Sequence, residues 1–480
     1  MLLSAALALL LAAPGPRCVQ IAAMNDVHGR LERLPLLAGR LAQIRREGPT
    51  LLLDAGDGMQ GTLEVALSRG ESLVAAYRAM GLAAAALGNH DFDYGQEALR
   101  RRIAAAPYPF LSANLVERAT GRLPGWPNLG GRRLFRFRGG PVVGVVGLAG
   151  EHTPYGTMPG NVRGLAFGRA ARTLERQAKA LRAEGAELVV AVAHLGGRCG
   201  PEREPADLSG CELDSDLFRL AQSLPPGLVD AVVGGHTHAY LRRLVNGVAL
   251  LEAGAWGQAL GWLTLCVGEA PRFRPFLRAA GARPDRRVAA AIAPYLAAAR
   301  ADRERPVGVT LASPLTRDST ALSPLGAASA GAIRAALGTD FGLMNAGGLR
   351  ADLPAGELRY GQLFEAMPFE DGLAVLRVRL ADLAQMSRAL TRGGRGFPQW
   401  SGLRFQGGAL TNCDGQPLDP DRVYTLGTNE FLAAGGDGLR RVVTRLGPEN
   451  VAMRGDLLLR DAIAEWLRRA PADRLASPCP

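Results

Sequence analysis

Short, mostly apolar runs recur along the first half of the chain, and most of them lead directly into polar side chains that can bind metal ions. The runs of this kind cover residues 19–24, 50–53, 82–87, 188–193 and 228–233, and a similar run without such an ending covers residues 142–148. Their length and apolar character are typical of strands that are buried on both faces of a sheet. The first half therefore predicts a sheet-based core with functional groups at the strand ends.

Stretches with helical spacing lie between several of these runs, at residues 34–46, 65–80 and 169–184. Alternation of strand, loop and helix predicts a layered α/β fold. In such folds the loops that follow the strands meet at one edge of the sheet. We therefore expect the polar loops to converge on a single site.

The distribution of histidine supports a shared site. The chain contains six histidines. A single histidine is more often an ordinary core or surface residue than a ligand, but histidines repeatedly placed after strands indicate a common function. The five that follow apolar runs are His28, His90, His194, His236 and His238, whereas His152 lies elsewhere and is interpreted as an ordinary loop residue.

The loop residues have the chemistry of a site for two metal ions. Asp26 and His28 are two residues apart, so in an extended chain their side chains point to the same side and can hold one cation. Asp57 follows a glycine and could bridge two cations, with Asn89, His194 and His236 completing the second ion and His238 the first. Mixed oxygen and nitrogen ligands suit zinc, manganese or iron. Two ions about 3.5–4 Å apart activate a bridging water and bind phosphate oxygens.

The stretch Asn89-His90-Asp91-Phe92-Asp93 adds an acid–base candidate. An imidazole that binds no metal could protonate a leaving oxygen or stabilise the charge that develops on it. Spacing alone allows either Asp91 or Asp93 to orient His90. His90 and one of these two carboxylates are therefore the predicted catalytic pair.

Composition sets the size and class of the protein. The chain has 480 residues, enough for two domains or three small ones, and 48% of them are hydrophobic and 21% charged, as expected for a globular protein. The formal charge is +11, but the arginines are scattered along the sequence rather than gathered in one block. We interpret them as a solvated basic surface that could also steer an anionic small molecule, and we expect no nucleic-acid partner.

Cysteine usage and the first residues bear on the compartment. None of the six cysteines forms a Cys-x-x-Cys motif, which argues against a thiolate zinc site. Residues 1–13 are almost wholly apolar, as in the hydrophobic region of a signal peptide, although no Lys or Arg precedes them. We therefore expect a signal peptide at residues 1–17, no transmembrane segment, export to a periplasm or the extracellular space, and a disulfide between Cys199 and Cys211.

The second half has a different pattern. Residues 282–305 are rich in Ala and Arg at helical spacing, and from residue 306 onward the Gly-rich loops contain no histidine. This change predicts a first domain at 18–280, a linker helix at 281–305 and a second domain at 306–470.

The complete set of motifs resembles a known family. The ordered series Asn25-Asp26-Val27-His28-Gly29, Gly56-Asp57, Gly88-Asn89-His90-Asp91, His194 and Gly235-His236-Thr237-His238 resembles the calcineurin-like metallophosphoesterase signature. In the second half, Asn345-Ala346-Gly347-Gly348-Leu349-Arg350, Asn429-Glu430-Phe431 and Gly435-Gly436-Asp437-Gly438 resemble the C-terminal domain of the 5′-nucleotidase family. The resemblance implies an N-terminal layered α/β metallophosphoesterase sandwich followed by an α+β substrate-binding domain.

The resemblance also implies roles for individual residues. One divalent ion is expected on Asp26, His28, Asp57 and His238, and the other on Asp57, Asn89, His194 and His236. The resemblance also favours Asp93 over Asp91 as the partner of His90. In the second domain, Phe431 and either Phe397 or Trp400 are expected to sandwich a base, Asp437 to bind ribose, and Asn345 and Arg350 to bind polar or anionic groups.

Two positions depart from the family pattern. Leu439 stands where relatives often have an aromatic residue, and a second substrate-binding arginine is not evident because Arg377 and Arg379 alternate with apolar residues in a predicted strand. These departures concern the substrate rather than the metals.

The predicted function is hydrolysis of nucleoside 5′-monophosphates, with a metal-bridging hydroxide as nucleophile and His90 assisted by Asp93. The alternatives are a UDP-sugar, a 2′,3′-cyclic nucleotide or a sulfur ester as substrate. Outside the enzymes, the alternative is a non-catalytic nucleotide-binding protein.

Overall fold

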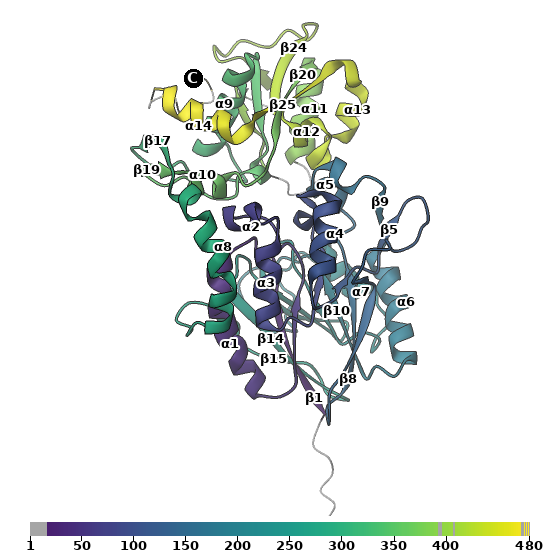
Figure 1. Cartoon of the computed structure of the whole chain (residues 1–480). Coiled ribbons are helices and arrows are strands. Elements are labelled where there is room, and N and C mark those ends of the chain that lie inside the picture. Colours follow the sequence, from purple (N-terminus) through teal and green to yellow (C-terminus); the bar gives the residue numbers. More distant parts are fainter. Residues whose placement is uncertain are drawn as a thin grey trace, which may run out of the picture.

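The chain folds into two domains, connected along one side by helix α8, Arg286–Glu304 (Figure 1). The computed structural model describes residues 17–391, 396–406 and 409–471, together with residues 475, 477 and 479. Apart from Arg17, the predicted signal peptide lies outside the described residues. Within these residues, none of the helices combines the length and the apolar character that a membrane crossing requires.

The first domain contains two mixed β-sheets. The first sheet has the strand order β15-β14-β1-β2-β3-β4-β6, and β16 also pairs with β14. β1 is parallel to β2 and antiparallel to β14. The strands are β1 (Cys18–Met24), β2 (Thr50–Asp54), β3 (Ala84–Ala86), β4 (Phe110–Leu111), β6 (Leu129–Gly130), β14 (Ala259–Cys266), β15 (Arg272–Phe273) and β16 (Leu277–Arg278).

The second sheet has the order β12-β13-β11-β10-β8-β7. Its four central strands, β13, β11, β10 and β8, are mutually parallel. The strands are β7 (Arg132–Arg136), β8 (Val142–Leu148), β10 (Leu188–Ala193), β11 (Ala231–Val233), β12 (Tyr240–Val245) and β13 (Val248–Ala253).

Side-chain alternation packs the two sheets into a sandwich. Along β1, Val19, Ile21 and Ala23 join a core shared with strands of the second sheet, whereas Ala22 and Met24 face the opposite core beneath helices. One helical layer consists of α1 (Leu34–Arg46), α3 (Glu71–Met80) and α4 (Gly95–Ala105), and the other of α6 (Ala170–Ala183) and α7 (Asp216–Ser223). The predicted layered α/β fold is confirmed as a four-layer sandwich.

Three predicted elements differ from the structure. The strand expected at 228–233 begins only at Ala231. The helix expected at 65–80 is two helices, α2 (Leu63–Leu67) and α3, because Arg69 and Gly70 adopt left-handed φ values of 44° and 86° between them. The strand expected at 82–87 is shorter and covers only Ala84–Ala86. Polar residues and a glycine interrupt the helix, whereas the apolar run at 82–87 extends beyond the residues that pair with β2 and β4.

The second domain is α+β, as predicted. Its main sheet has the order β21-β18-β24-β20-β25 and carries an apolar core on each face. The strands are β18 (Phe341–Met344), β20 (Gly372–Val378), β21 (Gln399–Ser401), β24 (Tyr424–Asn429) and β25 (Val451–Leu458). The helices include α9 (Pro324–Leu337), α10 (Tyr360–Ala366), α11 (Leu380–Thr391), α12 (Glu430–Ala433), α13 (Arg440–Leu446) and α14 (Leu459–Arg469).

Ion pairs connect the two domains beside α8. Arg303 at the end of α8 lies 3.0 Å from Glu64 of the first domain and 2.9 Å from Glu365 of the second. Arg30 lies 2.7 Å from the same Glu365. These contacts hold the ligand-bearing end of the sandwich against the second domain.

All six cysteines form disulfides: Cys18 with Cys266, Cys199 with Cys211, and Cys413 with Cys479. The expected Cys199–Cys211 bond is therefore present in the structure. The other two join segments that are distant in the sequence.

Candidate metal centre and substrate cavity

Three residues from two strand-end loops form a first cluster of metal-type ligands. Asp26 and His28 follow β1, and His238 follows β11. Asp26 Oδ1 lies 3.3 Å from His238 Nε2 and 3.8 Å from His28 Nε2, and the two imidazole nitrogens are 3.1 Å apart. The three side chains therefore point toward a common centre.

A second cluster is formed by Asp57 after β2, His194 after β10 and His236 after β11. His194 Nε2 lies 3.1 Å from Asp57 Oδ2 and 3.2 Å from His236 Nδ1. The other nitrogen of His194 lies 2.9 Å from the carbonyl oxygen of Ala55. A proton on Nδ1 donated to that carbonyl leaves Nε2 as a lone-pair ligand, as in many protein metal sites.

The chemistry of both clusters fits divalent cations. Asp26 Oδ1 and His28 Nδ1 are buried without a hydrogen-bond partner among the described residues, and such atoms are costly unless something compensates them. Burial opposes ionisation of Asp26, but the nearby imidazoles of His238 and His194 hold the pKa of its carboxyl well below the ordinary value. Ionised carboxylates beside imidazole nitrogens are the oxygen and nitrogen donors that zinc or manganese prefers.

The backbone of these loops is strained at the ligand residues themselves. A left-handed φ is uncommon outside glycine, and strain of this kind concentrates at functional sites. The ligand-type residues with a left-handed φ are Asp26 (48°), His28 (46°), Asp57 (59°), His236 (81°) and His238 (59°). The surrounding structure therefore stabilises these loops in a conformation that the residues do not prefer.

Asn89 lies beside the second cluster. Its Nδ2 donates to the carbonyl oxygen of Gly156 at 2.8 Å, which leaves the amide oxygen available as a neutral ligand. The loop can come this close because Gly88 precedes Asn89: a Cβ at Gly88 would lie 2.0 Å from Asp57 Oδ1. Asn89 thus lies in a loop that approaches Asp57, and its role as a seventh ligand stays a prediction.

The structure distinguishes the two carboxylates near His90. Asp93 Oδ2 lies 2.8 Å from His90 Nδ1, and the other oxygen of Asp93 accepts a hydrogen bond from Thr157 Oγ1 at 2.8 Å. Asp91 instead points away from the imidazole and accepts backbone N–H groups of Asp57, Gly58, Met59 and Gly88. Asp93 is therefore placed to orient His90, and Asp91 holds the loop that carries Asp57.

Electrostatics favour a protonated His90. Burial alone would lower the pKa of the imidazole, but the carboxylates of Asp93 and Asp57 outweigh that effect and raise the pKa above its ordinary value. The side chain is only 12% exposed, so water screens these interactions weakly.

A cavity of about 410 Å³ joins this centre to the second domain. Asn89, His90 and His236 line it from the first domain. The predicted substrate-binding residues that line it from the second domain are Asn345, Arg350, Phe431 and Asp437. Residues about 250 positions apart in the sequence thus share one cavity, as a substrate that spans both domains requires.

Polar contacts orient the residues of the second domain. Arg350 Nη2 lies 3.4 Å from His28 Nε2 and so reaches the first cluster. Asn345 donates to Asp437 Oδ2 at 2.8 Å and accepts from Asn429 at 3.1 Å. The ring of Phe431 lies against Gly436, where a Cβ would come within 2.5 Å of it.

Two predicted aromatic residues are not brought to the cavity. Trp400 is 2% exposed and packs in the core of the second domain. Phe397 is half-buried and does not line the cavity. Leu439 is a core residue, and Arg377 and Arg379 are exposed, as their alternation predicts. The second stacking ring therefore stays a prediction.

Phe369 is a cavity residue that the sequence did not single out. Its ring centroid lies 5.6 Å from that of His90. The backbone beside it is held by Arg460, which donates to the carbonyl oxygens of Met367 at 3.1 Å and Phe369 at 2.9 Å. Glu370 and Asp371 follow Phe369, but no histidine or apolar strand run precedes this segment, so only the tertiary structure places it in the cavity.

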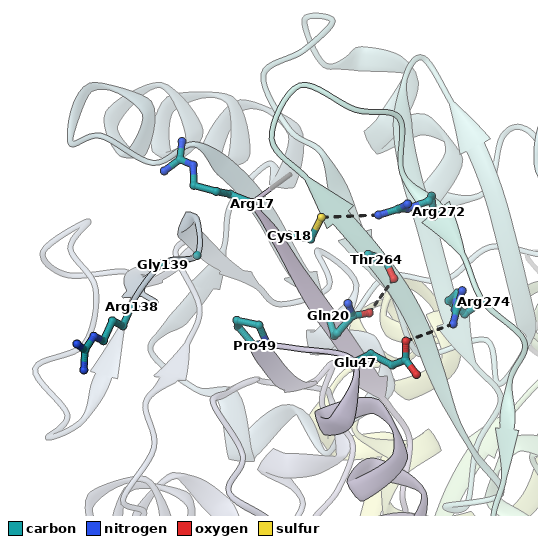
Figure 2. Close-up of a pocket in the computed structure, with 11 residues that line it drawn as sticks. Arg17, Cys18, Gln20, Glu47, Pro49, Arg138, Gly139, Thr264, Arg272 and Arg274 are labelled. Carbon is teal, nitrogen blue, oxygen red and sulfur yellow. Dashed lines mark hydrogen bonds and ion pairs between the residues drawn. The ribbon is translucent and has the colours of Figure 1, made fainter. Parts of the chain in front are cut away.

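Figure 2 shows a second cavity, of about 520 Å³, at the start of β1. Arg17 and Arg138 point away from its middle, and Arg274 lies 3.9 Å from Glu47. Neither candidate metal cluster lies in it. The cavity between the domains is therefore the candidate functional site.

Comparison with known proteins agrees with this geometry. The calcineurin-like phosphoesterase family matches residues 19–240, and the 5′-nucleotidase C-terminal domain matches residues 301–444. The chain belongs to the 5′-nucleotidase family of metal-dependent phosphoesterases.

Relatives of this family align over nearly the whole chain. The silent protein UshA(0) of Salmonella typhimurium is 24% identical over 94% of the chain and 91% of its own length. Endonuclease YhcR of Bacillus subtilis is also 24% identical over 94% of the chain, which spans only 39% of that longer protein.

Two solved structures from Thermus thermophilus share the fold. The 5′-nucleotidase precursor superposes with a TM-score of 0.78 at 23% identity, covering 94% of this chain and 96% of its own. The sulfate thiohydrolase SoxB superposes with a TM-score of 0.73 at 20% identity, covering 94% of each chain. At these identities the likeness establishes the two-domain fold and not the substrate.

Substitution of His236 by Ala tests the second cluster. Losing one imidazole should lower the amount of bound Mn²⁺ and reduce the rate of phosphate release by about 100-fold or more. Even substitutions of residues that only contact the ligands lower metal affinity or activity by about 10–100-fold. Metal content by plasma mass spectrometry and a phosphate assay measure both effects. His152→Ala is the control because that side chain is 62% exposed and lies outside both clusters. Full metal content and activity in His236→Ala would contradict the assignment.

Proposed function

We propose that this protein hydrolyses nucleoside 5′-monophosphates to nucleosides and phosphate. The observation that carries the proposal is the shared cavity, because it brings His236 of the second cluster together with an arginine, an aromatic ring and a carboxylate of the second domain. The arginine also reaches His28 of the first cluster. A phosphate, a base and a ribose require those three kinds of group. A plain phosphatase would have no need of the last two.

The seven ligand-type residues would hold two divalent ions. Asp26, His28 and His238 would hold one ion, Asn89, His194 and His236 the other, and Asp57 would contact both. When bound, such ions supply Lewis acidity that activates water and neutralises phosphate charge.

The remaining residues position the substrate and move a proton. Arg350 would bind a phosphate oxygen with its guanidinium, near the first cluster. His90, oriented by Asp93, would donate the Nε2 proton to the leaving ribose oxygen as the phosphorus–oxygen bond breaks. Phe369, beside His90, would limit the access of bulk water to that proton transfer.

The nucleoside would occupy the part of the cavity in the second domain. Phe431 would stack on the base, because flat bases gain from aromatic faces. Asp437, held by Asn345, would accept hydrogen bonds from ribose hydroxyls. UDP-sugars, cyclic nucleotides and sulfur esters would use the same metal clusters and are the alternative substrates to test.

Export from the cytoplasm is part of the proposal. Three disulfides use every cysteine of the chain, and such bonds persist in oxidising compartments. Together with the apolar first residues, they support a periplasmic or extracellular location.

Dependence on the leaving group tests the role of His90. His90→Asn and Asp93→Asn should slow hydrolysis of AMP by about 10²–10⁴-fold, because an alkoxide leaves poorly without a proton. The same variants should hydrolyse 4-nitrophenyl phosphate with a far smaller loss, because nitrophenolate needs no proton to leave. Steady-state kinetics at saturating Mn²⁺ give both ratios. Equal losses on the two substrates would remove His90 as the proton donor.

Substitution of Phe431 by Ala tests base stacking. A stacked base is worth about 1–3 kcal/mol, so the KM for AMP should rise by roughly 5- to 100-fold. The KM for glycerol phosphate, which has no base, should change little. Phe276→Ala is the matched control, since that ring packs against Tyr240 and Arg242 in the first domain and does not line the cavity. The same loss on both substrates would make Phe431 a core residue rather than a stacking surface.

A further inference from the structure

A buried carboxylate that the proposed reaction does not use lies behind the histidine loops. Glu252 is in β13 and is fully buried. Its Oε1 lies 2.7 Å from Thr237 Oγ1 and accepts the backbone N–H of Ala239 at 3.1 Å. Its Oε2 lies 2.9 Å from the same hydroxyl and accepts the backbone N–H of Gly197 at 3.3 Å. Every contact made by these two oxygens is to a loop that carries metal-type ligands.

These contacts join two separate loops. Gly197 lies three residues after His194, whereas Thr237 lies between His236 and His238. The loops also touch directly, because a Cβ at Gly196 would lie 2.3 Å from Thr237 Cγ2. One carboxylate thus connects the loops that supply three of the seven predicted ligands.

Burying the Glu252 side chain costs folding free energy unless its oxygens are hydrogen-bonded. Burial, reinforced by the charge of Asp26, raises the pKa of Glu252 to about 8, while hydrogen bonds from Thr237, Ala239 and Gly197 lower it. Glutamine at this position would place an amide N–H₂ against N–H donors and leave at least one of them unpaired. In either protonation state both Glu252 oxygens can accept a backbone N–H, and a protonated oxygen can also donate to the Thr237 hydroxyl, whereas an amide nitrogen cannot accept.

We propose that Glu252 is a positioning residue that fixes the His236–His238 loop against the His194 loop. The left-handed φ values of His236 and His238 are unfavourable for histidine, so the loop needs such an external anchor. With the anchor, His194 Nε2 and His236 Nδ1 stay 3.2 Å apart and face one position beside Asp57. This role rests on the proposed metal-dependent function.

Glu252→Gln and a matched control test the proposal with Mn²⁺ alone. The full chain, freed of metal, is titrated with Mn²⁺ by calorimetry, and activity is followed against Mn²⁺ concentration. The Glu252→Gln variant should bind one of two ions about 10–100-fold more weakly, which is the usual loss of metal affinity when a residue that orients the ligands is changed. The Mn²⁺ concentration for half-maximal activity should rise, while kcat at saturating Mn²⁺ should stay within a few-fold of wild type. Thr237→Val, which removes the hydroxyl from the same contact, should reproduce the weakening if Glu252→Gln does not fold.

Asp230→Asn is the control for a purely structural effect. Asp230 accepts the N–H of Val189 at 2.6 Å in the same sheet but precedes β11, at the end opposite the histidines. The Asp230→Asn variant should have a lower melting temperature than wild type but the same affinity for Mn²⁺. If Glu252→Gln behaves like Asp230→Asn, the proposal is wrong. A wild-type chain that binds no Mn²⁺ would contradict the metal site and this role together, whereas one that binds two ions but hydrolyses no nucleotide would contradict only the proposed substrate.

Discussion

Two buried carboxylates, Asp26 and Asp57, face imidazole rings at one edge of the sandwich, and the architecture around them depends on keeping them there. A buried negative charge is stable only when counter-charges and hydrogen bonds surround it. Strand ends from both sheets supply the histidines, and strained loops turn the ligands inward. Asp91 and Glu252 lie behind the ligand loops and stabilise them, since each side chain accepts backbone N–H groups of those loops. Asp26 and Asp57 are thus suited to bind cations, whereas Asp91 and Glu252 hold the loops in place.

In the proposed function, the second domain would add selectivity to a centre that could otherwise accept many phosphate esters. Arg350 reaches across the interface to His28, and Phe431 and Asp437 line the same cavity. The ion pairs of Arg303 with Glu64 and Glu365 stabilise this arrangement beside the connecting helix. In the proposed function, substrate choice would therefore depend on the contact between domains as much as on either domain alone.

The sequence predicts the parts of this structure that are encoded locally. Apolar runs followed by Asp, Asn or His marked the strands and the seven ligand-type residues, because strand burial and strand-end loops depend on near neighbours. The sequence could not decide between Asp91 and Asp93, since both are within reach of His90 and only folding shows that Asp91 is occupied by backbone N–H groups. Glu252 and Phe369 gave no signal because their partners are distant in the chain. Trp400 stood in a family-like motif, yet it packs in the core.

The most direct test of the account is phosphate release from a panel of AMP, UMP, UDP-glucose, a 2′,3′-cyclic nucleotide and an aryl phosphate, with Mn²⁺ and again with a chelator. The account predicts hydrolysis that the chelator abolishes and that is fastest, by kcat/KM, for a nucleoside monophosphate. Hydrolysis that survives the chelator would contradict the metal centre. Chelator-sensitive hydrolysis of the aryl phosphate alone would contradict the nucleotide pocket.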